Sequence, residues 1–280
     1  MHNGLSSVSR PVLRYHGGKW VLAPWDISHF PPHKIYLEPY GGAASVLLRK
    51  PRSYAEVYND LDGELVNVFR VLRDPKQAAA LVDALRLTPF ARAEFEAAYE
   101  PSCDPVDQAR KTMARCFMGF GSNAHSHKTG FRANSNRSGT TGAHDWAHFP
   151  DQIMTFCRRL AGVVLECRPA LDIISQHDSA ETLIYCDPPY PAETRNPGHD
   201  YNFEMDATDH GSLAQRLHAI RGMAIISGYP CELYNRLYGD WECHTTGTYA
   251  DGARARTECL WLSPQVSERL YPIFRDVRGA

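Results

Sequence analysis

The sequence lacks the features of a membrane protein. Its 280 residues contain no run of about eighteen consecutive apolar residues, the length that a membrane-spanning helix requires. The N-terminal stretch MHNGLSSVSRPVLRYHGGKW also lacks the apolar region of a signal peptide. We therefore expect a protein that works in the cytoplasm and has no membrane partner.

Paired cysteines and a strong net charge are missing as well. The eight cysteines are scattered singly, without a C-x-x-C pair or the dense spacing of a small disulfide framework. We therefore expect reduced thiols. The formal net charge of −2 does not by itself indicate a polyanionic partner.

One segment departs from this charge balance. Between Arg110 and Arg159 the chain carries eight Lys or Arg residues and two acidic residues. Four histidines lie in the same segment, at positions 125, 127, 144 and 148. The charge alone fits a solvated surface loop as well as a surface for a polyanion.

Alternating strand and helix patterns at both ends of the chain predict an α/β fold. Apolar runs bounded by turn residues predict strands at 35–38, 54–59, 163–167, 182–186, 223–227 and 257–262. Helical spacing is found at 43–50, 62–73, 75–87, 89–100, 106–118, 152–160, 210–220 and 231–238. Because residues 63–160 lack strong strand signals, we expect a sheet domain interrupted by a mainly helical insertion.

The insertion is expected to end in a long loop, residues 119–150. Its sequence is crowded with Gly, Ser, Asn, Thr and basic residues. A loop of this length is either disordered or functional, and its positive charge favours a binding surface. His125 and His127, and the i, i+4 pair His144 and His148, have metal-ligand spacing. No Glu base or Cys pair accompanies them, so we expect no metal.

The segment YLEPYGGAAS ends a short strand at Glu38 and turns through Gly41 and Gly42 into a helix. Glycines at such a turn let a ligand approach the backbone, and the helix N-terminus offers amide donors. The spacing does not match the G-x-G-x-x-G dinucleotide fingerprint. Asp60 follows the next strand, where it is either a ribose ligand or the N-cap of the following helix.

The segment RYHGGKW contains a second glycine turn. It lacks the spacing of a phosphate-binding P-loop. It is similar to the HGG of esterase oxyanion holes, but the chain contains no G-x-S-x-G nucleophile motif. Two interpretations stay open: a structural turn into a helix, or a tight turn that places Tyr15 and Lys19 beside an adenosine-type ligand.

The segment LIYCDPPY ends an apolar strand with an acid, two prolines and an aromatic ring. Prolines fix φ and lack N–H donors, so their carbonyls and the Asp187 carboxylate can face outward as acceptors. Tyr190 supplies a flat face on which a heterocycle can stack. A proline-rich turn is the structural alternative, but the cluster suits a planar base with an exocyclic amine.

Taken in order, YHGGK, EPYGGAAS, YNDLD and CDPPY resemble the landmarks of one family across nearly the whole chain. This family is the S-adenosylmethionine-dependent DNA N6-adenine methyltransferases of the alpha group, the Dam type. The C-terminal part is also similar to phage and prophage members. The resemblance implies a Rossmann-like class I methyltransferase sheet at residues 1–62 and 161–280, interrupted by a target-recognition insertion at residues 63–160.

The resemblance also implies roles for individual residues. The catalytic residues are Asp187, Pro188 and Tyr190, which bind the target amine and stack on its base. The cofactor contacts are Tyr15, Lys19, Glu38, Pro39, Gly41, Gly42, Asp60 and Asp187.

Candidates for DNA contacts follow from side-chain chemistry in the basic segment and near the first glycine turn. Arginine suits guanine edges, asparagine suits adenine, and lysine suits phosphate. The candidates are Arg14, Lys128, Arg132, Asn134, Asn136 and Arg137.

We therefore expect an enzyme that transfers a methyl group from S-adenosylmethionine to N6 of an adenine flipped out of double-stranded DNA, acting as a monomer or weak dimer. A cytosine-N4 or RNA amino methyltransferase is one alternative, and a catalytically silent DNA-binding module is another. The catalytic tetrad of this chain is D-P-P-Y, residues 187–190. The cytosine enzymes of the family more often begin this tetrad with Ser, so Asp187 favours adenine. The presence of Asp187, Asp60 and Lys19 argues against loss of catalysis.

Overall fold

The computed structural model describes residues 8–133, 140–195, 201–250 and 254–271. The chain forms two compact units, each built from three chain segments. The helical unit comprises Met1–Trp20, Gly42–Pro51 and Asp62–Leu165, and the sheet unit comprises Val21–Gly41, Arg52–Leu61 and Glu166–Ala280.

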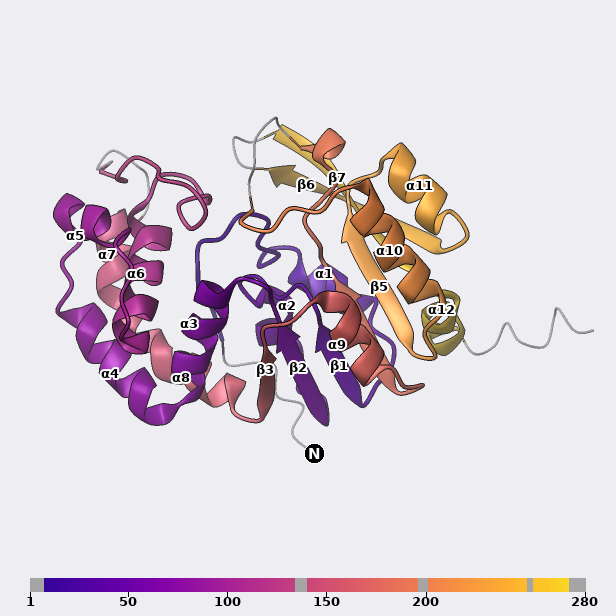
Figure 1. Cartoon of the computed structure of the whole chain (residues 1–280), viewed down its shortest axis with the longest axis horizontal. Helices are drawn as coiled ribbons and strands as arrows, with labels where there is room; N and C mark the ends of the chain where they lie inside the picture. The colour runs from indigo at the N-terminus through magenta and orange to yellow at the C-terminus, as the bar shows by residue number, and fades with distance from the viewer. Residues whose placement is uncertain (1–7, 134–139, 196–200, 251–253, 272–280) are drawn as a thin grey trace, which may run out of the picture. The chain divides into compact units, whose positions relative to one another are not determined.

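The helical unit is built mainly from α-helices (Figure 1). They are α2 (Ser45–Arg49), α3 (Gly63–Arg73), α4 (Pro75–Arg86), α5 (Arg92–Ala97), α6 (Pro105–Met118), α7 (Gly142–His148) and α8 (Ile153–Leu160). The side chains of Asp62, Asp74 and Asp104 accept hydrogen bonds from backbone N–H groups in the first turns of α3, α4 and α6. Such caps satisfy amides that a helix leaves unpaired, so these aspartates set where the helices begin.

Helix α7 lies within the loop expected at residues 119–150, and that expectation is wrong for this part. The Thr141 side chain caps α7 by accepting from the His144 N–H. Trp146 is buried, and its indole N–H donates to the Thr88 carbonyl at 2.8 Å. Burial of this large aromatic side chain stabilises a short helix in a segment whose composition is typical of a loop. A 3-10 turn, Phe149–Gln152, then leads into α8.

The sheet unit contains a mostly parallel sheet. Its strands are β1 (Ile35–Glu38), β2 (Ala55–Asn59), β4 (Thr182–Cys186), β5 (Met223–Gly228), β6 (Glu242–Ala250) and β7 (Arg254–Leu262). They run in the order β2-β1-β4-β5-β7-β6, and β3 (Val163–Glu166) completes seven strands at the β2 edge. The pairs β1–β2, β1–β4 and β4–β5 are parallel, whereas β7 pairs with both β5 and β6 in the antiparallel sense.

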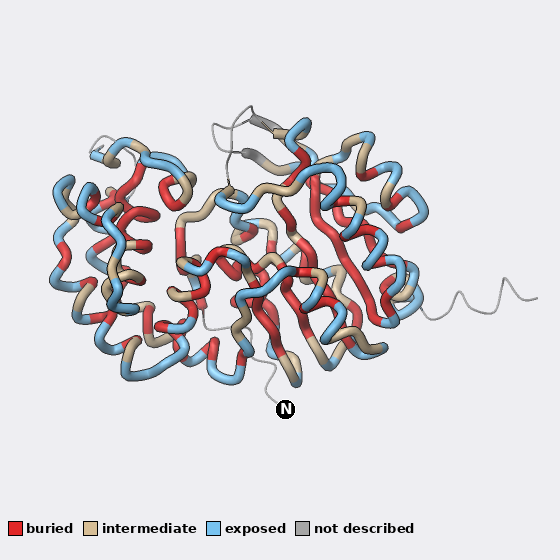
Figure 2. The backbone as a smooth tube through the Cα atoms, viewed as in Figure 1, coloured by how far each residue is buried: buried red, intermediate tan, exposed pale blue. Residues whose placement is uncertain are grey.

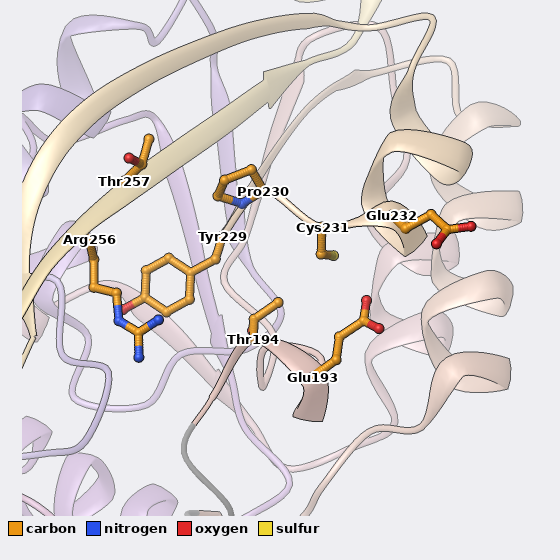
Figure 3. A pocket seen from close by; sticks show the side chains of 8 residues that line it. All are labelled: Glu193, Thr194, Tyr229, Pro230, Cys231, Glu232, Arg256 and Thr257. Atoms are coloured by element: carbon orange, nitrogen blue, oxygen red, sulfur yellow. The ribbon is translucent and has the colours of Figure 1, made fainter.

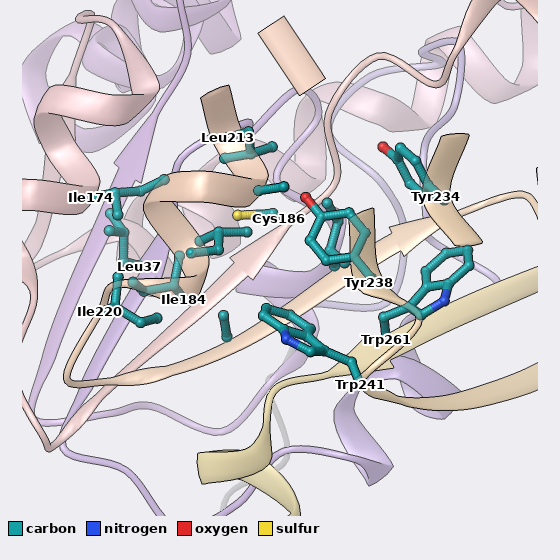
Figure 4. Close-up of a cluster of buried hydrophobic side chains, with 14 of the residues drawn as sticks. Leu37, Ile174, Ile184, Cys186, Leu213, Ile220, Tyr234, Tyr238, Trp241 and Trp261 are labelled. Atoms are coloured by element: carbon teal, nitrogen blue, oxygen red, sulfur yellow. The ribbon is translucent and has the colours of Figure 1, made fainter. Parts of the chain in front are cut away.

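Helices α1 (Ala23–Ser28), α9 (Ala170–His177), α10 (Ala207–His218), α11 (Glu232–Tyr238) and α12 (Pro264–Leu270) belong to the same unit. Every residue of β4 and β5 is buried, as expected for central strands with both faces covered (Figure 2). Leu37 and Ile184 pack with Ile174 of α9, Leu213 of α10 and Tyr238 of α11 in one core cluster (Figure 4).

Side chains on alternate positions point to the opposite face of the sheet. Tyr36 and Tyr185 contact the ring of Phe30, at centroid distances of 5.8 and 5.6 Å. The Tyr185 hydroxyl donates to the buried carboxylate of Asp26 on α1 at 2.9 Å. This alternation is the period of two that a strand imposes.

The predicted α/β fold class is confirmed, and all six predicted strands occur, with ends shifted by at most three residues. Strand β6 and helices α1, α7, α9 and α12 were not predicted. Strand β6 has the sequence ECHTTGTYA, whose polar composition does not predict a strand. It is an edge strand that pairs with β7 over nine residue pairs. Among the described residues, no helix is long and apolar enough to cross a bilayer.

Candidate active site

Three carboxylates of the sheet unit lie at the carboxyl ends of neighbouring strands. Glu38 is the last residue of β1, Asp60 directly follows β2, and Asp187 directly follows β4. Because these three strands are parallel and adjacent, their carboxyl ends share one edge of the sheet. Ligands of open α/β sheets bind at this edge.

Glu38 is buried and held by a neighbouring tyrosine. The Tyr36 hydroxyl donates to Glu38 Oε2 at 2.8 Å. Burial, followed by the negative charge of Glu38, raises the pKa of Tyr36 well above its usual value. The tyrosine therefore stays a hydrogen-bond donor and fixes one side of the carboxylate.

The turn after β1 requires glycine. A Cβ atom on Gly41 would lie 2.1 Å from the ring of Tyr58 on the neighbouring strand β2, far inside van der Waals contact. The Gly41 N–H also donates to the Asn59 carbonyl at 2.8 Å. Gly41 therefore lets the turn lie directly against β2, and Pro39 within it is buried.

Asn59 anchors this turn and was missed by sequence reasoning. Its side-chain NH₂ donates to the carbonyls of Pro39 (2.9 Å) and Arg168 (3.0 Å), and its Oδ1 accepts from the Arg168 N–H (3.0 Å). Three chain segments are thus tied together at the carboxyl edge. An asparagine that ends an apolar strand was the available signal, because a fully buried amide must find such partners.

The structure decides between the two interpretations of Asp60. The N-cap of α3 is Asp62, whose Oδ1 accepts from the N–H groups of Glu64 (2.9 Å) and Leu65 (3.4 Å). Asp60 instead lies partly exposed at the tip of β2, where its own N–H donates to the Glu166 carbonyl at 3.4 Å. The N-cap alternative for Asp60 is therefore wrong, and its ribose role stays a prediction.

Residues 187–190 leave β4 as a rigid segment. Asp187 is partly exposed, whereas Pro188 and Tyr190 are buried. The Arg195 guanidinium donates through Nε to the Tyr190 carbonyl at 2.8 Å and pairs with Glu204 at 3.1 Å. Two prolines and this clamp restrict the backbone that follows the acid.

The Tyr190 side chain is fixed at both of its ends. Its hydroxyl lies 2.7 Å from Ser227 Oγ and donates to Glu258 Oε1, and Ser227 donates to the same carboxylate oxygen at 3.0 Å. Its ring meets that of Tyr229 edge-to-face, with centroids 4.8 Å apart. Sequence reasoning missed Ser227, Tyr229 and Glu258. The available signal was SGYP at the end of β5, the strand beside β4.

An open cavity of about 470 Å³ lies beside Tyr229 (Figure 3). It is lined by Glu193, Thr194, Tyr229, Pro230, Cys231, Glu232, Arg256 and Thr257. The Arg256 guanidinium lies 5.5 Å from the centre of the Tyr229 ring. An aromatic face with a cation beside it suits a nucleotide, whose base and phosphate need those two partners.

In the helical unit, the first glycine turn and Gly42 come together. The Gly18 N–H donates to the Tyr15 carbonyl at 3.2 Å, and the buried Lys19 ammonium donates to the Gly17 carbonyl at 3.4 Å. Gly42 has φ +48°, and a Cβ there would lie 3.2 Å from the Tyr15 ring. Glycine is therefore favoured at position 42 by both backbone and space.

A buried ion pair lies beside Tyr15. His125 Nε2 is 2.7 Å from Asp62 Oδ2, and the His125 ring centroid is 5.7 Å from that of Tyr15. Burial is the largest single influence and lowers the pKa of His125, but the hydrogen bonds and charges of Asp62 and Cys116 together outweigh it, and the pKa is raised to about 10. The charged histidine ties residues 122–127 to the start of α3. It is engaged with a carboxylate rather than with His127, and the described residues contain no cluster of three metal-ligand side chains.

The basic segment is less free than its composition suggests. Arg110 pairs with Glu94 (3.4 Å) and Asp107 (2.7 Å), Arg115 pairs with Glu64, and Arg159 is buried. The acids that pair with these arginines precede the segment in sequence. The excess of positive charge in the segment therefore overstates how many basic side chains on these helices are available to contact DNA.

The predicted DNA contacts fall into three groups. Lys128 is exposed, with its ammonium 5.7 Å from the centre of the Tyr99 ring. Arg14 and Arg132 are half-buried, and Arg132 Nη1 donates to the Phe117 carbonyl at 3.5 Å. Asn134, Asn136 and Arg137 lie outside the described residues.

Comparison with known proteins supplies the family. Residues 15–247 match the D12 class N6 adenine-specific DNA methyltransferases. A DNA adenine methylase of Serratia marcescens is 23% identical over 254 residues, covering 84% of this chain and 88% of its own length. The DNA adenine methylase of Escherichia coli K12 is 22% identical, with 75% and 74% covered, and that of Vibrio cholerae O395 is 25% identical, with 82% and 84% covered. The chain belongs to the D12 class of N6 adenine-specific DNA methyltransferases.

Proposed function

We propose that this DNA adenine methyltransferase transfers the methyl group of S-adenosylmethionine to N6 of an adenine flipped out of double-stranded DNA. One observation carries the proposal. Asp187, Pro188 and Tyr190 form a rigid acceptor-and-ring segment at the carboxyl end of β4, beside the carboxylates that end β1 and β2.

The edge of the sheet fits the chemistry of the cofactor. S-Adenosylmethionine supplies an electrophilic methyl group on a positively charged sulfur. Carboxylates suit its ribose diol and its amino group. Gly41, which lies directly against β2, adds no side chain to the turn. Asp60 is assigned to the ribose, and the turn Glu38, Pro39, Gly41 and Gly42 to the amino-acid end. Tyr15, Lys19 and Asp187 complete the proposed set on the basis of their motifs.

Adenine N6 is a poor nucleophile because its lone pair is delocalised into the ring. Asp187 and the Pro188 carbonyl accept hydrogen bonds from the two N6 protons, which localises the lone pair on nitrogen. N6 would then attack the methyl carbon of the bound donor, so that the N–C bond forms as the bond between that carbon and the sulfonium sulfur breaks. The bonding electrons would stay on sulfur, which leaves as the neutral thioether S-adenosylhomocysteine, and one N6 proton would pass to solvent. Positioning and preorganised acceptors supply most of the acceleration.

Tyr190 stacks on the extruded base in this proposal, and the neighbouring cavity with Tyr229 and Arg256 gives the nucleotide room. Flipping costs a few kcal/mol, which stacking and hydrogen bonding in the site offset. The DNA contacts are assigned to the 63–160 segment of the helical unit, through Lys128, Arg132 and the loop asparagines and arginine, with Arg14 near the target base. Binding is expected to be salt-dependent.

A methyl-transfer assay tests the proposal. Purified protein, S-adenosylmethionine labelled on its methyl group and unmethylated plasmid duplex should yield labelled N6-methyladenine among the digested nucleosides. Asp187→Ala should reduce transfer by more than about a hundredfold. Asp172→Ala, which removes an exposed carboxylate of α9 in the same unit, is the matched control.

Each alternative has its own outcome. Label on cytosine or only on RNA would favour one of the other amino methyltransferases. DNA binding without any transfer by the wild-type protein would favour a silent binding module. Undiminished transfer by Asp187→Ala would remove Asp187 from the catalytic role.

A further inference from the structure

The hydroxyl of Tyr190 belongs to a buried polar triad. Tyr190, Ser227 and Glu258 are 6%, 0% and 2% exposed. The Tyr190 and Ser227 hydroxyls each donate to Glu258 Oε1, and their oxygens lie 2.7 Å apart. The three come from different parts of the sheet: the exit of β4, the end of β5 and the middle of β7. These strands are adjacent in the order β4-β5-β7.

A buried carboxylate at this place has a cost. Removing a charge from water is unfavourable unless hydrogen bonds replace its hydration, and apolar side chains of similar volume often stabilise a core equally well. Phe, Ala and Leu in place of Tyr190, Ser227 and Glu258 would fill comparable space without any polar atoms. The triad therefore provides something that packing alone does not.

What the triad provides is one ring orientation. A buried phenylalanine ring is restrained by packing only, whereas the Tyr190 ring is tied at its far end to a carboxylate on a strand two positions away. Burial, the charge of Asp187 and that of Glu258 all raise the pKa of Tyr190 well above its usual value, so the hydroxyl remains a donor. The tie is thus present throughout the ordinary pH range.

We propose that Glu258 is a positioning residue for methyl transfer, which acts by fixing the Tyr190 ring through its hydroxyl. Ser227 braces the carboxylate by donating to the same oxygen. The inference rests on the proposed function, because it concerns how the stacking tyrosine beside Asp187 is held. Glu258 touches neither substrate nor cofactor in this proposal.

Four variants isolate the tie. Tyr190→Phe keeps the ring and removes the hydroxyl. Glu258→Leu removes the acceptor, whereas Glu258→Gln keeps an acceptor oxygen at the same place. Tyr185→Phe is the matched control, because it removes another buried tyrosine–carboxylate hydrogen bond, the 2.9 Å contact with Asp26 in the same unit.

The readout separates turnover from binding. With labelled S-adenosylmethionine and unmethylated plasmid duplex, Tyr190→Phe and Glu258→Leu should each lower kcat about tenfold and change KM for the plasmid less than about twofold. Glu258→Gln should recover most of kcat, and Tyr185→Phe should retain it. The Tyr190→Phe, Glu258→Leu double variant should be no slower than the slower single variant, since both changes break one tie.

Several results would overturn the inference: wild-type kcat in Tyr190→Phe, multiplying losses in the double variant, or an equal loss of kcat in Tyr185→Phe. If Glu258→Leu fails to fold, Tyr190→Phe alone decides. Tyr190→Ala separates this inference from the proposed function. A slow Tyr190→Ala beside a fully active Tyr190→Phe removes the tie but keeps the stacking role, whereas a fully active Tyr190→Ala removes the stacking role itself.

Discussion

His125 in the helical unit and His210 in the sheet unit are both buried, yet their surroundings push them to opposite charge states. His125 contacts the Asp62 carboxylate at 2.7 Å, and its pKa is raised to about 10. His210 Nδ1 lies 3.3 Å from the Tyr234 hydroxyl, and burial lowers its pKa to about 4 despite Asp209 and Asp206 nearby. In the helical unit, the ion pair between His125 and Asp62 holds a loop in place. In the sheet unit, His210 stays neutral inside an apolar layer.

The difference follows from what each histidine joins. His125 connects a polar loop segment to the N-terminus of α3, where Asp62 is already present as the cap. His210 lies on α10, beside the core cluster of the sheet unit, where its ring contacts the neutral hydroxyl of Tyr234. A histidine accepts a second proton only where a neighbouring anion compensates for lost hydration.

Replacing His125 with Gln should have the largest effect on stability. Removing one partner of a buried ion pair leaves the other uncompensated, which costs about 4 kcal/mol. The contribution is fully present below the unfolded pKa of 6.5 and is lost as pH rises towards about 10, because the unfolded chain releases the proton first. Urea unfolding at pH 6, 8 and 10 should show the gap between variant and wild type closing. A constant gap would contradict a charged His125.

Replacing Gly41 with Ala tests the sheet unit, where stability at this turn depends on close packing rather than on a charge pair. The added Cβ would meet the Tyr58 ring at 2.1 Å, so Tyr58 or the turn must shift. Such overpacking should lower the free energy of unfolding by about 2.5 kcal/mol. Gly211→Ala in α10 is the control, since open space surrounds that glycine and helix propensity favours Ala by roughly 0.5–1 kcal/mol. Equal stability of the two variants would contradict the close approach.

His210→Gln sharpens the comparison of the two histidines at low pH. The wild-type stability is fully present above pH 6.5 and is lost as pH falls towards about 4, because the unfolded chain takes up the proton first. Glutamine is neutral throughout and can still pair with Tyr234. Between pH 7 and pH 4.5 the wild type should therefore lose on the order of 2 kcal/mol more than the variant. Equal losses in the unfolding curves would mean that His210 is charged in the folded protein.

Lys128→Ala should have the smallest effect, and it acts on DNA affinity rather than on stability. Loss of one phosphate contact should weaken binding to plasmid duplex about threefold and reduce the slope of log affinity against log salt by about one. Lys76→Ala, an exposed lysine of α4 in the same unit, should change neither quantity. Identical slopes for wild type and Lys128→Ala would exclude a phosphate contact by this residue.

Much of the sheet could be predicted because its signals are local. The continuous apolar run of β4 reflects burial on both faces, and the Asp, Pro and Pro after it indicate where the strand must stop. Strand β6 and helix α7 were missed because their signals are not local. Their residues are polar or mixed, and each is stabilised by partners elsewhere: β7 for the strand, Thr88 for Trp146 of the helix.

The sequence by itself determined where β4 ends and predicted an acceptor segment at residues 187–190, because proline geometry and side-chain chemistry act within a few residues. The same local information left Asp60 with two roles, and the cap formed by Asp62 removed one of them. Only the tertiary structure decided that the Tyr190 hydroxyl meets Ser227, 37 residues away, and Glu258, 68 residues away. Strand order and register bring such groups together, and neither is encoded in the spacing of residues along the chain.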